Sequence, residues 1–215
     1  MIHIKKFSFN MLQENCYVAN CDTTKECVVV DCGAYYDDER KALLAYIHDN
    51  QLKPVYLLCT HGHIDHNFGN NTIFDEFGIT PEVHADDKAL MDKLPQQSVQ
   101  FIGHSPQYEF PSPTHYLSDG DEIKFGNHSL HVIHTPGHSK GSVCFYIKDE
   151  GILLTGDTLF RMSIGRTDLE GGSMMQIIQS LRQLAQLPDE TIILPGHGPE
   201  STMGDELRYN PFLDR

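Results

Sequence analysis

Four apolar runs of this chain end in a turn that carries a histidine or an aspartate. The first run, "PVYLLC" at 54–59, leads into the cluster "THGHIDH" at 60–66. The other three end in "TPGH" at 135–138, "TGD" at 155–157 and "PGHG" at 195–198. Short apolar runs bounded by turn residues are typical of buried strands. Strand ends are where functional groups gather in α/β sheets, so we expect a fold in which these four ends meet.

The residues at these strand ends are of the types that bind transition metals. Imidazole nitrogens and carboxylate oxygens are ligands for zinc, iron and manganese. Side chains repeat every two residues in an extended segment, so His61 and His63 point the same way and can bind one ion. Asp65 and His66 follow a turn later and can reach a second ion, and the two oxygens of Asp157 can bridge two cations. The candidate metal ligands are His61, His63, Asp65, His66, His138, Asp157 and His197.

Other histidines and cysteines near these motifs are interpreted as structural. A lone histidine on a strand is more often a surface or core residue than a ligand, and His134 is therefore predicted to be a strand residue. Cys59, two residues before His61, is predicted to belong to a buried strand. The sequence offers no separate serine or cysteine nucleophile with a partnering base.

The charge balance argues against a nucleic-acid partner. The chain has 16 Lys and Arg against 30 Asp and Glu, which gives a formal net charge of −14. Such a charge repels a phosphate backbone. With 215 residues, of which 40% are hydrophobic, the chain is predicted to form one domain over residues 1–215.

The N-terminal segment resembles neither a signal peptide nor a membrane anchor. Ser8, Asn10, Gln13 and Glu14 interrupt its apolar residues, and no run approaches the roughly 18 apolar residues that span a bilayer. The six cysteines lack C-x-x-C spacing, which favours reduced and mostly buried thiols. We therefore predict a cytoplasmic protein without a membrane partner; oligomeric state has no signal in the sequence.

The order of the predicted elements favours two sheets. Strands are predicted at 2–9, 16–20, 26–33, 54–59, 81–85 and 191–198, with alternating strands and turns over 115–160. Helices are predicted at 37–51, 70–78, 85–94 and 173–187, the last with Ser173 as its N-cap. The segment 95–115 has four prolines and no period, so it is predicted to be a long loop. Because hairpins dominate both halves, the pattern predicts an α+β fold with helices outside two sheets rather than a doubly wound parallel sheet.

Taken in order, the four motifs resemble the metallo-β-lactamase superfamily. "THGHIDH", "TPGHSKGS", "GDTLF" and "PGHG" fall between residues 60 and 198. The opening "ENCYVA" and the closing "RYNPFL" resemble its glyoxalase II-like branch, in a short single-domain bacterial form. The resemblance thus extends over nearly the whole chain. It implies an αββα sandwich in which two mixed sheets pack face to face and metals lie at one edge between them.

The resemblance also implies two metal positions. One ion would be held by three histidines, the other by an aspartate and two histidines, and one aspartate would bridge them. By matching positions these are His61, His63 and His138 for the first ion, Asp65, His66 and His197 for the second, and Asp157 between them. Zinc is the expected metal, with iron and manganese as alternatives, because histidine and carboxylate sites accept all three.

Within the superfamily, the resemblance favours thioester cleavage. The β-lactam-cleaving branch usually lacks the histidine that follows the first-motif aspartate, whereas His66 is present here. Glyoxalase II enzymes hydrolyse S-hydroxyacyl-glutathione, and in them a basic residue after "GDTLF" meets the glutathione carboxylate; Arg166 stands at that place. This chain departs from the glyoxalase II pattern in two places. Thr167-Asp168 replaces an aromatic residue, and only 18 residues (215 − 197) follow His197, so the helical C-terminal domain of those enzymes is not expected.

Three alternatives remain open. The stretch "GRTD" also resembles the persulfide dioxygenases of the superfamily, which keep one iron. A non-catalytic metal-binding protein would share the ligand set, and a nucleic-acid hydrolase of this superfamily conflicts with the charge of −14. The leading hypothesis is a hydrolase acting on a small-molecule thioester of the S-hydroxyacyl-glutathione type. In it, two ions supply hydroxide and Asp65 is the catalytic residue that orients it.

Overall fold

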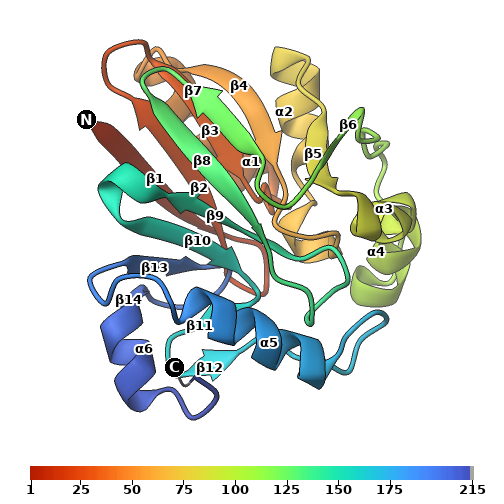
Figure 1. Ribbon diagram of the computed structural model, residues 1–215. Coiled ribbons are helices and arrows are strands. Elements are labelled where there is room, and N and C mark those ends of the chain that lie inside the picture. The colour runs from red at the N-terminus through yellow and green to blue at the C-terminus, as the bar shows by residue number, and fades with distance from the viewer. Residues whose placement is uncertain (214–215) are drawn as a thin grey trace.

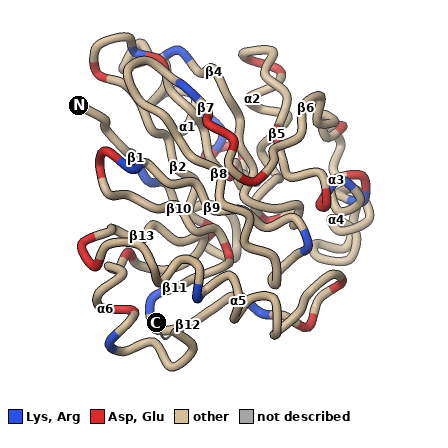
Figure 2. The backbone as a smooth tube through the Cα atoms, viewed as in Figure 1, with Lys and Arg blue, Asp and Glu red and all other residues tan. Residues whose placement is uncertain are grey.

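The computed structural model describes residues 1–213. Two six-stranded sheets pack face to face, and helices cover their outer faces (Figure 1). The sequence-based prediction of an α+β sandwich is therefore confirmed. Lys and Arg positions are scattered along the backbone rather than gathered on one element (Figure 2). Within residues 1–213, every helix is too short or too polar to cross a bilayer.

The first sheet follows chain order from β1 to β6. It consists of β1 (Ile2–Phe9), β2 (Glu14–Cys21), β3 (Glu26–Val30), β4 (Lys53–Leu58), β5 (Pro81–His84) and β6 (His115–Leu117). The first three strands are antiparallel hairpin partners, and β3 to β6 run parallel. The parallel part places the carboxyl ends of β3, β4 and β5 at the same edge.

The second sheet has the order β14-β13-β10-β9-β8-β7. Its strands are β7 (Glu122–Phe125), β8 (His128–His134), β9 (Val143–Ile147), β10 (Ile152–Gly156), β13 (Ile192–Pro195) and β14 (Ser201–Thr202). Only β10 and β13 pair in parallel, so their carboxyl ends lie side by side. A small ribbon of β11 (Leu159–Phe160) and β12 (Ser163–Ile164) follows β10.

The helices bury one apolar face each against a sheet. They are α1 (Asp37–Asp49), α2 (Asn70–Phe77), α3 (Lys88–Asp92), α4 (Leu94–Ile102), α5 (Met174–Leu184) and α6 (Met203–Tyr209), with 3₁₀ turns η1 (Ile64–His66), η2 (Ala85–Asp87) and η3 (Lys148–Glu150). Leu43 and Ile47 of α1 pack on the first sheet, and Leu181 of α5 packs on the second. Ser173 caps α5 by accepting a hydrogen bond from the Gln176 amide, as predicted.

The core between the sheets is entirely apolar in character. Val28 and Leu58 of the first sheet belong to one buried cluster with Val132, Phe145 and Leu154 of the second. Burial of side chains of this size contributes roughly 1.5–3 kcal/mol each to folding. All six cysteines are free and buried, which confirms the prediction of unpaired thiols.

The predicted loop at 95–115 is wrong over its first part, because residues 95–102 belong to α4. Pro95 occupies the first turn of this helix, where the missing amide would have had no partner in the helix. Gly103 ends it in the left-handed conformation at φ 83°. The polar Ser98 is buried and interrupts the apolar period that would have revealed the helix. The helix predicted at 85–94 is likewise divided into η2 and α3.

Candidate metal centre

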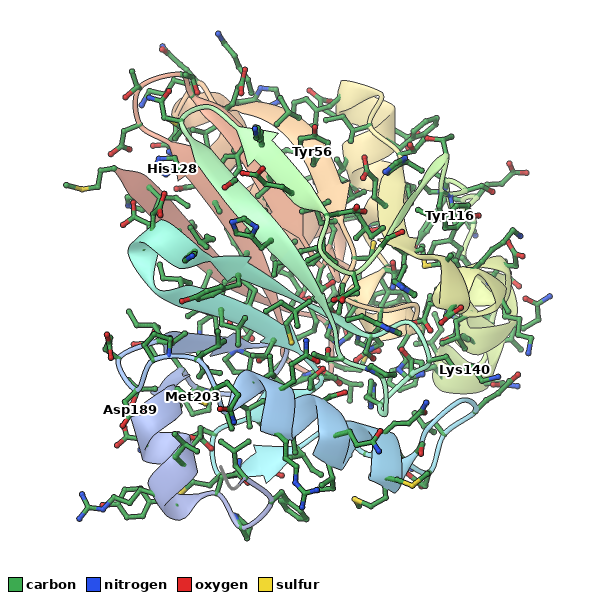
Figure 3. The ribbon with its side chains drawn as sticks, in the orientation of Figure 1. Tyr56, Tyr116, His128, Lys140, Asp189 and Met203 are labelled. Carbon is green, nitrogen blue, oxygen red and sulfur yellow. The ribbon has the colours of Figure 1, made fainter. Side chains whose placement is uncertain are left out.

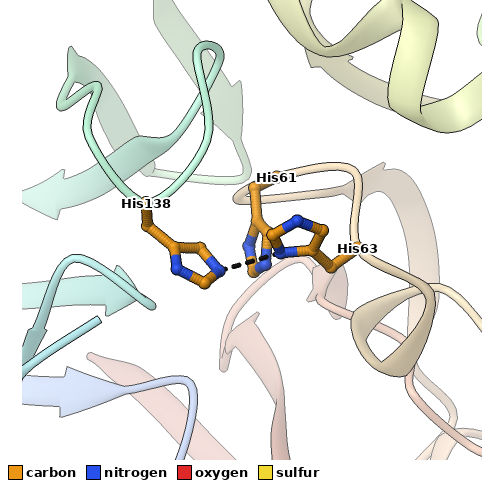
Figure 4. A group of neighbouring side chains, drawn as sticks. All are labelled: His61, His63 and His138. Atoms are coloured by element: carbon orange, nitrogen blue, oxygen red, sulfur yellow. Dashed lines mark hydrogen bonds between the residues drawn. The ribbon is translucent and has the colours of Figure 1, made fainter. Parts of the chain in front are cut away.

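Three histidines from both sheets meet at the edge of the sandwich. His61 and His63 follow β4, and His138 lies in the turn after β8 (Figure 4). Nδ1 of His63 lies 2.8 Å from Nε2 of His138. The ring centroid of His61 lies 4.8 Å from each of the other two. One potential ligand nitrogen from each ring lies within 4.8 Å of the others, a separation that suits binding to one cation.

A second group lies next to the first and contains a carboxylate. Oδ2 of Asp65 lies 3.6 Å from Nε2 of His66 and 3.3 Å from Nε2 of His197. His66 is fully buried on η1, whereas His197 follows β13 and is partly open to solvent. These three residues come from the carboxyl ends of β4 and β13, which belong to different sheets.

Asp157 lies between the two groups. Its Oδ1 is 3.3 Å from Nε2 of His66, and its Oδ2 is 3.6 Å from Nε2 of His138 and 3.7 Å from Nε2 of His197. Gly196 packs directly on this carboxylate, since a Cβ at that residue would lie 2.4 Å from Oδ1. The structure thus brings all seven predicted ligands together, with Asp157 facing members of both groups.

The donor atoms of this centre fit bound cations. Nε2 of His61, Nε2 of His66 and Oδ1 of Asp157 are buried and have no hydrogen-bond partner among residues 1–213. Buried polar atoms are nearly always paired, so such orphans need a ligand. Histidine nitrogens together with carboxylate oxygens suit zinc, iron or manganese. The residues present therefore match the metal group that the motifs imply.

Protonation differs between the two groups. Burial, helped by neighbouring histidines, lowers the pKa of His63 to about 4 and that of His61 well below its ordinary value. Burial also acts to lower the pKa of His66, but the carboxylates of Asp157, Asp65 and Asp31 outweigh it and raise that pKa well above the ordinary value. Burial acts to raise the pKa of Asp157, and the surrounding histidines overcome it and lower that pKa. His61 and His63 of the first group therefore favour the neutral form, whereas His66 and Asp157 favour their charged forms.

Asp31 supports this centre and was not singled out from the sequence. It follows β3 at φ 54°, a conformation unfavourable for most residues other than glycine. Its carboxylate accepts hydrogen bonds from the Thr60 amide and hydroxyl at 2.7 Å each and lies 3.0 Å from Nδ1 of His66. The contact directs Nε2 of His66 toward Asp157. The sequence did contain a signal for Asp31, because "ECVVVD" is another apolar strand that ends in an aspartate.

The hairpin of β1 and β2 holds the loop of His197. The Asn15 side chain donates to the carbonyl oxygens of Pro195 and Gly198 at 2.9 Å each, and the Tyr17 hydroxyl donates to that of Pro195 at 2.8 Å. From the turn before β2, the Asn10 side chain donates to the carbonyl oxygen of Asp65 at 2.9 Å. These contacts give a structural reason for the "ENCY" motif.

Arg166 contributes to the centre in two ways. Nδ1 of His138 bonds to its backbone carbonyl at 2.8 Å, which leaves Nε2 of His138 to face the other ligands. Its guanidinium pairs with Asp168 through two hydrogen bonds of 2.7 Å, both side chains being exposed. This pairing holds the pKa of Asp168 down at about 2. The backbone of Arg166 thus contacts the first ligand group, and its guanidinium already has a partner.

A cavity of about 400 Å³ opens onto the centre. Donor atoms of His63, Asp65, His138, Asp157 and His197 line its floor. Its walls are mostly apolar and come from distant parts of the chain, namely Leu12, Ile64, Leu90, Phe101 and Leu169, with Arg166 and Glu170 at the rim. A small substrate could therefore reach the candidate metal positions through an apolar entrance.

His134 lies in β8, which agrees with its interpretation as a strand residue. Its ring stacks on that of His84, with centroids 4.1 Å apart and planes inclined by 10°. Asp86 lies close to both, and the three could approach an ion. Parallel stacked rings cannot both direct a nitrogen lone pair at one ion, because the ion would have to lie in both ring planes.

Comparison with known proteins places the chain in a family. The model of the protein family described as "Metallo-beta-lactamase superfamily" matches residues 10–197. Hydroxyacylglutathione hydrolase GloC of Haemophilus influenzae is 32% identical over 99% of each chain. The fold of BLEG-1 B3 metallo-beta-lactamase superposes with a TM-score of 0.87 and 35% identity, over 98% of this chain and 99% of that one. TTHA1623 in a di-iron-bound form superposes with a TM-score of 0.83 and 35% identity, over 97% and 100%.

The chain belongs to the metallo-β-lactamase superfamily, which includes metallo-hydrolases with a dinuclear metal site. The histidine and aspartate cluster described above lies within the matched residues. Membership was predicted from the four motifs and is confirmed.

Proposed function

We propose that this protein is a two-metal hydrolase that cleaves thioesters of the S-hydroxyacyl-glutathione type. One observation carries the proposal: seven donor residues form two groups that share Asp157 and open onto one cavity. A site for a single structural ion would need neither the second group nor the cavity. The likeness to hydroxyacylglutathione hydrolase GloC over the whole chain supports the thioester as substrate.

Each donor residue has a place in this proposal. The first ion would be held by His61, His63 and His138, the second by Asp65, His66 and His197, and both by Asp157. When bound, two such cations lower the pKa of a shared water from about 15.7 to roughly 7, which makes hydroxide available at neutral pH. Zinc is the proposed metal, and iron and manganese suit the same donors.

Asp65 is proposed to orient the attacking oxygen. Its Oδ2 faces His66 and His197, which leaves Oδ1 to accept a hydrogen bond from the attacking hydroxide and so direct the hydroxide's lone pair at the thioester carbon. The departing thiolate is a good leaving group, so no strong general acid is required. The apolar side chains of Leu12 and Phe101 would hold the acyl part and exclude water from it.

Arg166 is proposed to bind a carboxylate of the thiol carrier. It lines the cavity and its side chain is exposed, so we expect its guanidinium to act on binding rather than on the chemical step. To do so its guanidinium must exchange Asp168 for the substrate carboxylate. The exchange costs little, because solvent screens an exposed ion pair of this kind and the pair contributes little to stability.

Two other reactions are candidates for the same centre. The likeness to BLEG-1 B3 metallo-beta-lactamase favours β-lactam hydrolysis as a second function. Against it stands the presence of His66, because the β-lactam-cleaving branch usually lacks a histidine at this position. The di-iron form of TTHA1623 shows iron in a similar protein and keeps open the persulfide oxygenation indicated by "GRTD". The three reactions consume different substrates: a thioester, a β-lactam, or a persulfide together with oxygen.

The test is a direct comparison of substrates with defined metals. Metal-free protein is reloaded with zinc or with iron and given S-lactoylglutathione, a β-lactam, or glutathione persulfide with an oxygen electrode. We expect the zinc form to hydrolyse S-lactoylglutathione faster than the β-lactam. Oxygen uptake by the iron form with an intact thioester in the parallel assay would overturn the hydrolase proposal.

A further inference from the structure

Asp87 is a buried carboxylate that belongs to neither ligand group. It ends η2, directly after β5 of the first sheet, and is completely shielded from solvent. Its Oδ2 accepts hydrogen bonds from the Gly62 amide at 2.9 Å and the Ser139 hydroxyl at 2.7 Å. Its Oδ1 accepts one from the Gly141 amide at 2.7 Å. Both carboxylate oxygens thus accept hydrogen bonds, and the three donors are uncharged groups of loops.

These donors belong to the two loops that carry the first ligand group. Gly62 lies between His61 and His63, and Ser139 directly follows His138. One loop leaves the first sheet and the other leaves the second, so the Asp87 carboxylate joins loops from opposite sheets. Charge-assisted hydrogen bonds of this length are roughly twice as strong as neutral ones. Asp87 therefore sets how far the two loops lie apart.

The approach of the second loop to Asp87 is close. A Cβ on Gly141 would lie 2.6 Å from the Asp87 backbone nitrogen, so only glycine fits this contact. The Ser139 hydroxyl also lies 2.7 Å from that of Ser142, which restrains the turn on its other side. Figure 3 labels Lys140, the residue between Ser139 and Gly141, on the side of the view where α3 and α4 lie.

The ordinary role of an aspartate at this place does not account for these contacts. Asp87 is the N-cap residue of α3, and such a residue normally accepts a hydrogen bond from the first turn of its own helix. Its side chain makes no such bond. The carboxylate turns instead toward the loops of His61, His63 and His138.

We propose that Asp87 is a positioning residue that brings His138 to the correct distance from His61 and His63. The second ligand group is held by different contacts, those of Asp31, Asn10 and Asn15. Loss of Asp87 should therefore weaken the first metal position and spare the second. The inference rests on the metal-binding part of the proposed function and is independent of the substrate.

The test measures metal affinity rather than turnover. Metal-free wild type, Asp87→Asn and Asp86→Asn are titrated with Zn²⁺ in competition with a chromophoric chelator. His63→Ala and His197→Ala identify which binding step belongs to which position. Asp86→Asn is a matched control, because Asp86 is the preceding residue and its side chain is 59% exposed. We expect Asp87→Asn to weaken the first step about 10- to 100-fold and leave the second within about threefold.

A milder variant keeps the inference testable if Asp87→Asn does not fold. Ser139→Ala removes one of the three hydrogen bonds and should weaken the first step roughly 3- to 10-fold. Wild-type affinity in Ser139→Ala, or equal weakening of both steps together with a lower unfolding temperature in Asp87→Asn, would overturn the positioning role. A wild type that binds no Zn²⁺ would overturn the proposed function and this inference with it.

Discussion

The two halves of the candidate metal centre are built differently. The half formed by His61, His63 and His138 has only histidine donors, and the pKa values of His61 and His63 are lowered. The half formed by Asp65, His66 and His197 contains a carboxylate and two histidines whose pKa values are raised. The first can accept a cation without releasing protons from His61 or His63. The second must release a proton from His66.

The supports of the two halves differ as well. The first half spans two loops joined by Asp87. The second depends on Asp31 behind His66 and on the β1–β2 hairpin, through Asn10 and Asn15. This difference leads us to expect separate roles, with the first position binding an ion at all times and the second supplying the nucleophile.

Replacing the residue shared by both halves should have the largest effect. Asp157→Ala removes the carboxylate that faces both groups, so both ions should be lost or bound very weakly. Hydrolysis should fall on the order of 1000-fold or more, since several kcal/mol of transition-state stabilisation are lost. Metal analysis after gel filtration checks this, with Asp149→Ala on the exposed η3 turn as the control. Two ions per chain in Asp157→Ala would refute the bridging role.

Removing a ligand from one half only should separate the two positions. His197→Ala should retain the first ion and lose the second, and hydrolysis should drop roughly 100-fold or more because the nucleophile is no longer supplied. His63→Ala should lose the first ion and retain the second. His3→Ala, on exposed β1, serves as the control. If His197→Ala hydrolysed thioester at the wild-type rate with one ion bound, the second position would not be the one that supplies the nucleophile.

The affinities of the two positions should respond differently to pH. The pKa of His66 is raised, so below that raised value the ring is protonated and the proton must leave before an ion binds. The pKa of His197 is raised as well, so affinity for the second ion should rise as pH increases from 6 to 8, by up to about tenfold per pH unit for each histidine proton released. His63, with a pKa of about 4, is already neutral over this range and adds no such slope to the first. Equal slopes in Zn²⁺ titrations at pH 6, 7 and 8 would contradict the assignment.

The smallest effect is expected at the rim of the cavity. Arg166→Ala should raise KM for a carboxylate-bearing thioester roughly tenfold and leave kcat nearly unchanged, because the His138 contact uses the backbone carbonyl of Arg166. Asp168→Asn should lower KM a few-fold, since it weakens the competition for the guanidinium. Steady-state kinetics decide, and a collapse of kcat in Arg166→Ala at unchanged KM would be evidence against the binding role.

Residues predicted from the sequence were those with a local signal. His61, His138, Asp157 and His197 each follow an apolar strand and a turn, so parallel strand ends were expected to bring them together, and they do lie together. The two-sheet fold was predictable for the same reason, since hairpins and strand order show in the pattern of apolar residues. Asp31 obeys the same rule and could have been included.

Residues that the sequence did not reveal act over long separations. Asp87 contacts Gly141, which is 54 residues away, and no periodicity or spacing connects the two. Gln97 similarly bonds to the backbone on both sides of His63, through the Gly62 carbonyl and the Ile64 amide. It lies on α4, the helix that was predicted to be a loop. Such polar contacts depend on tertiary packing, which a pattern of apolar residues does not encode.

The dependence of hydrolysis on metal equivalents tests the central claim most directly. Metal-free wild type is titrated with Zn²⁺ at pH 7.5 while S-lactoylglutathione hydrolysis is followed. The account predicts little activity up to the first equivalent, which fills the three-histidine position, and a steep rise to a plateau at the second. Full activity at one equivalent would contradict the claim that the two halves divide the reaction between them.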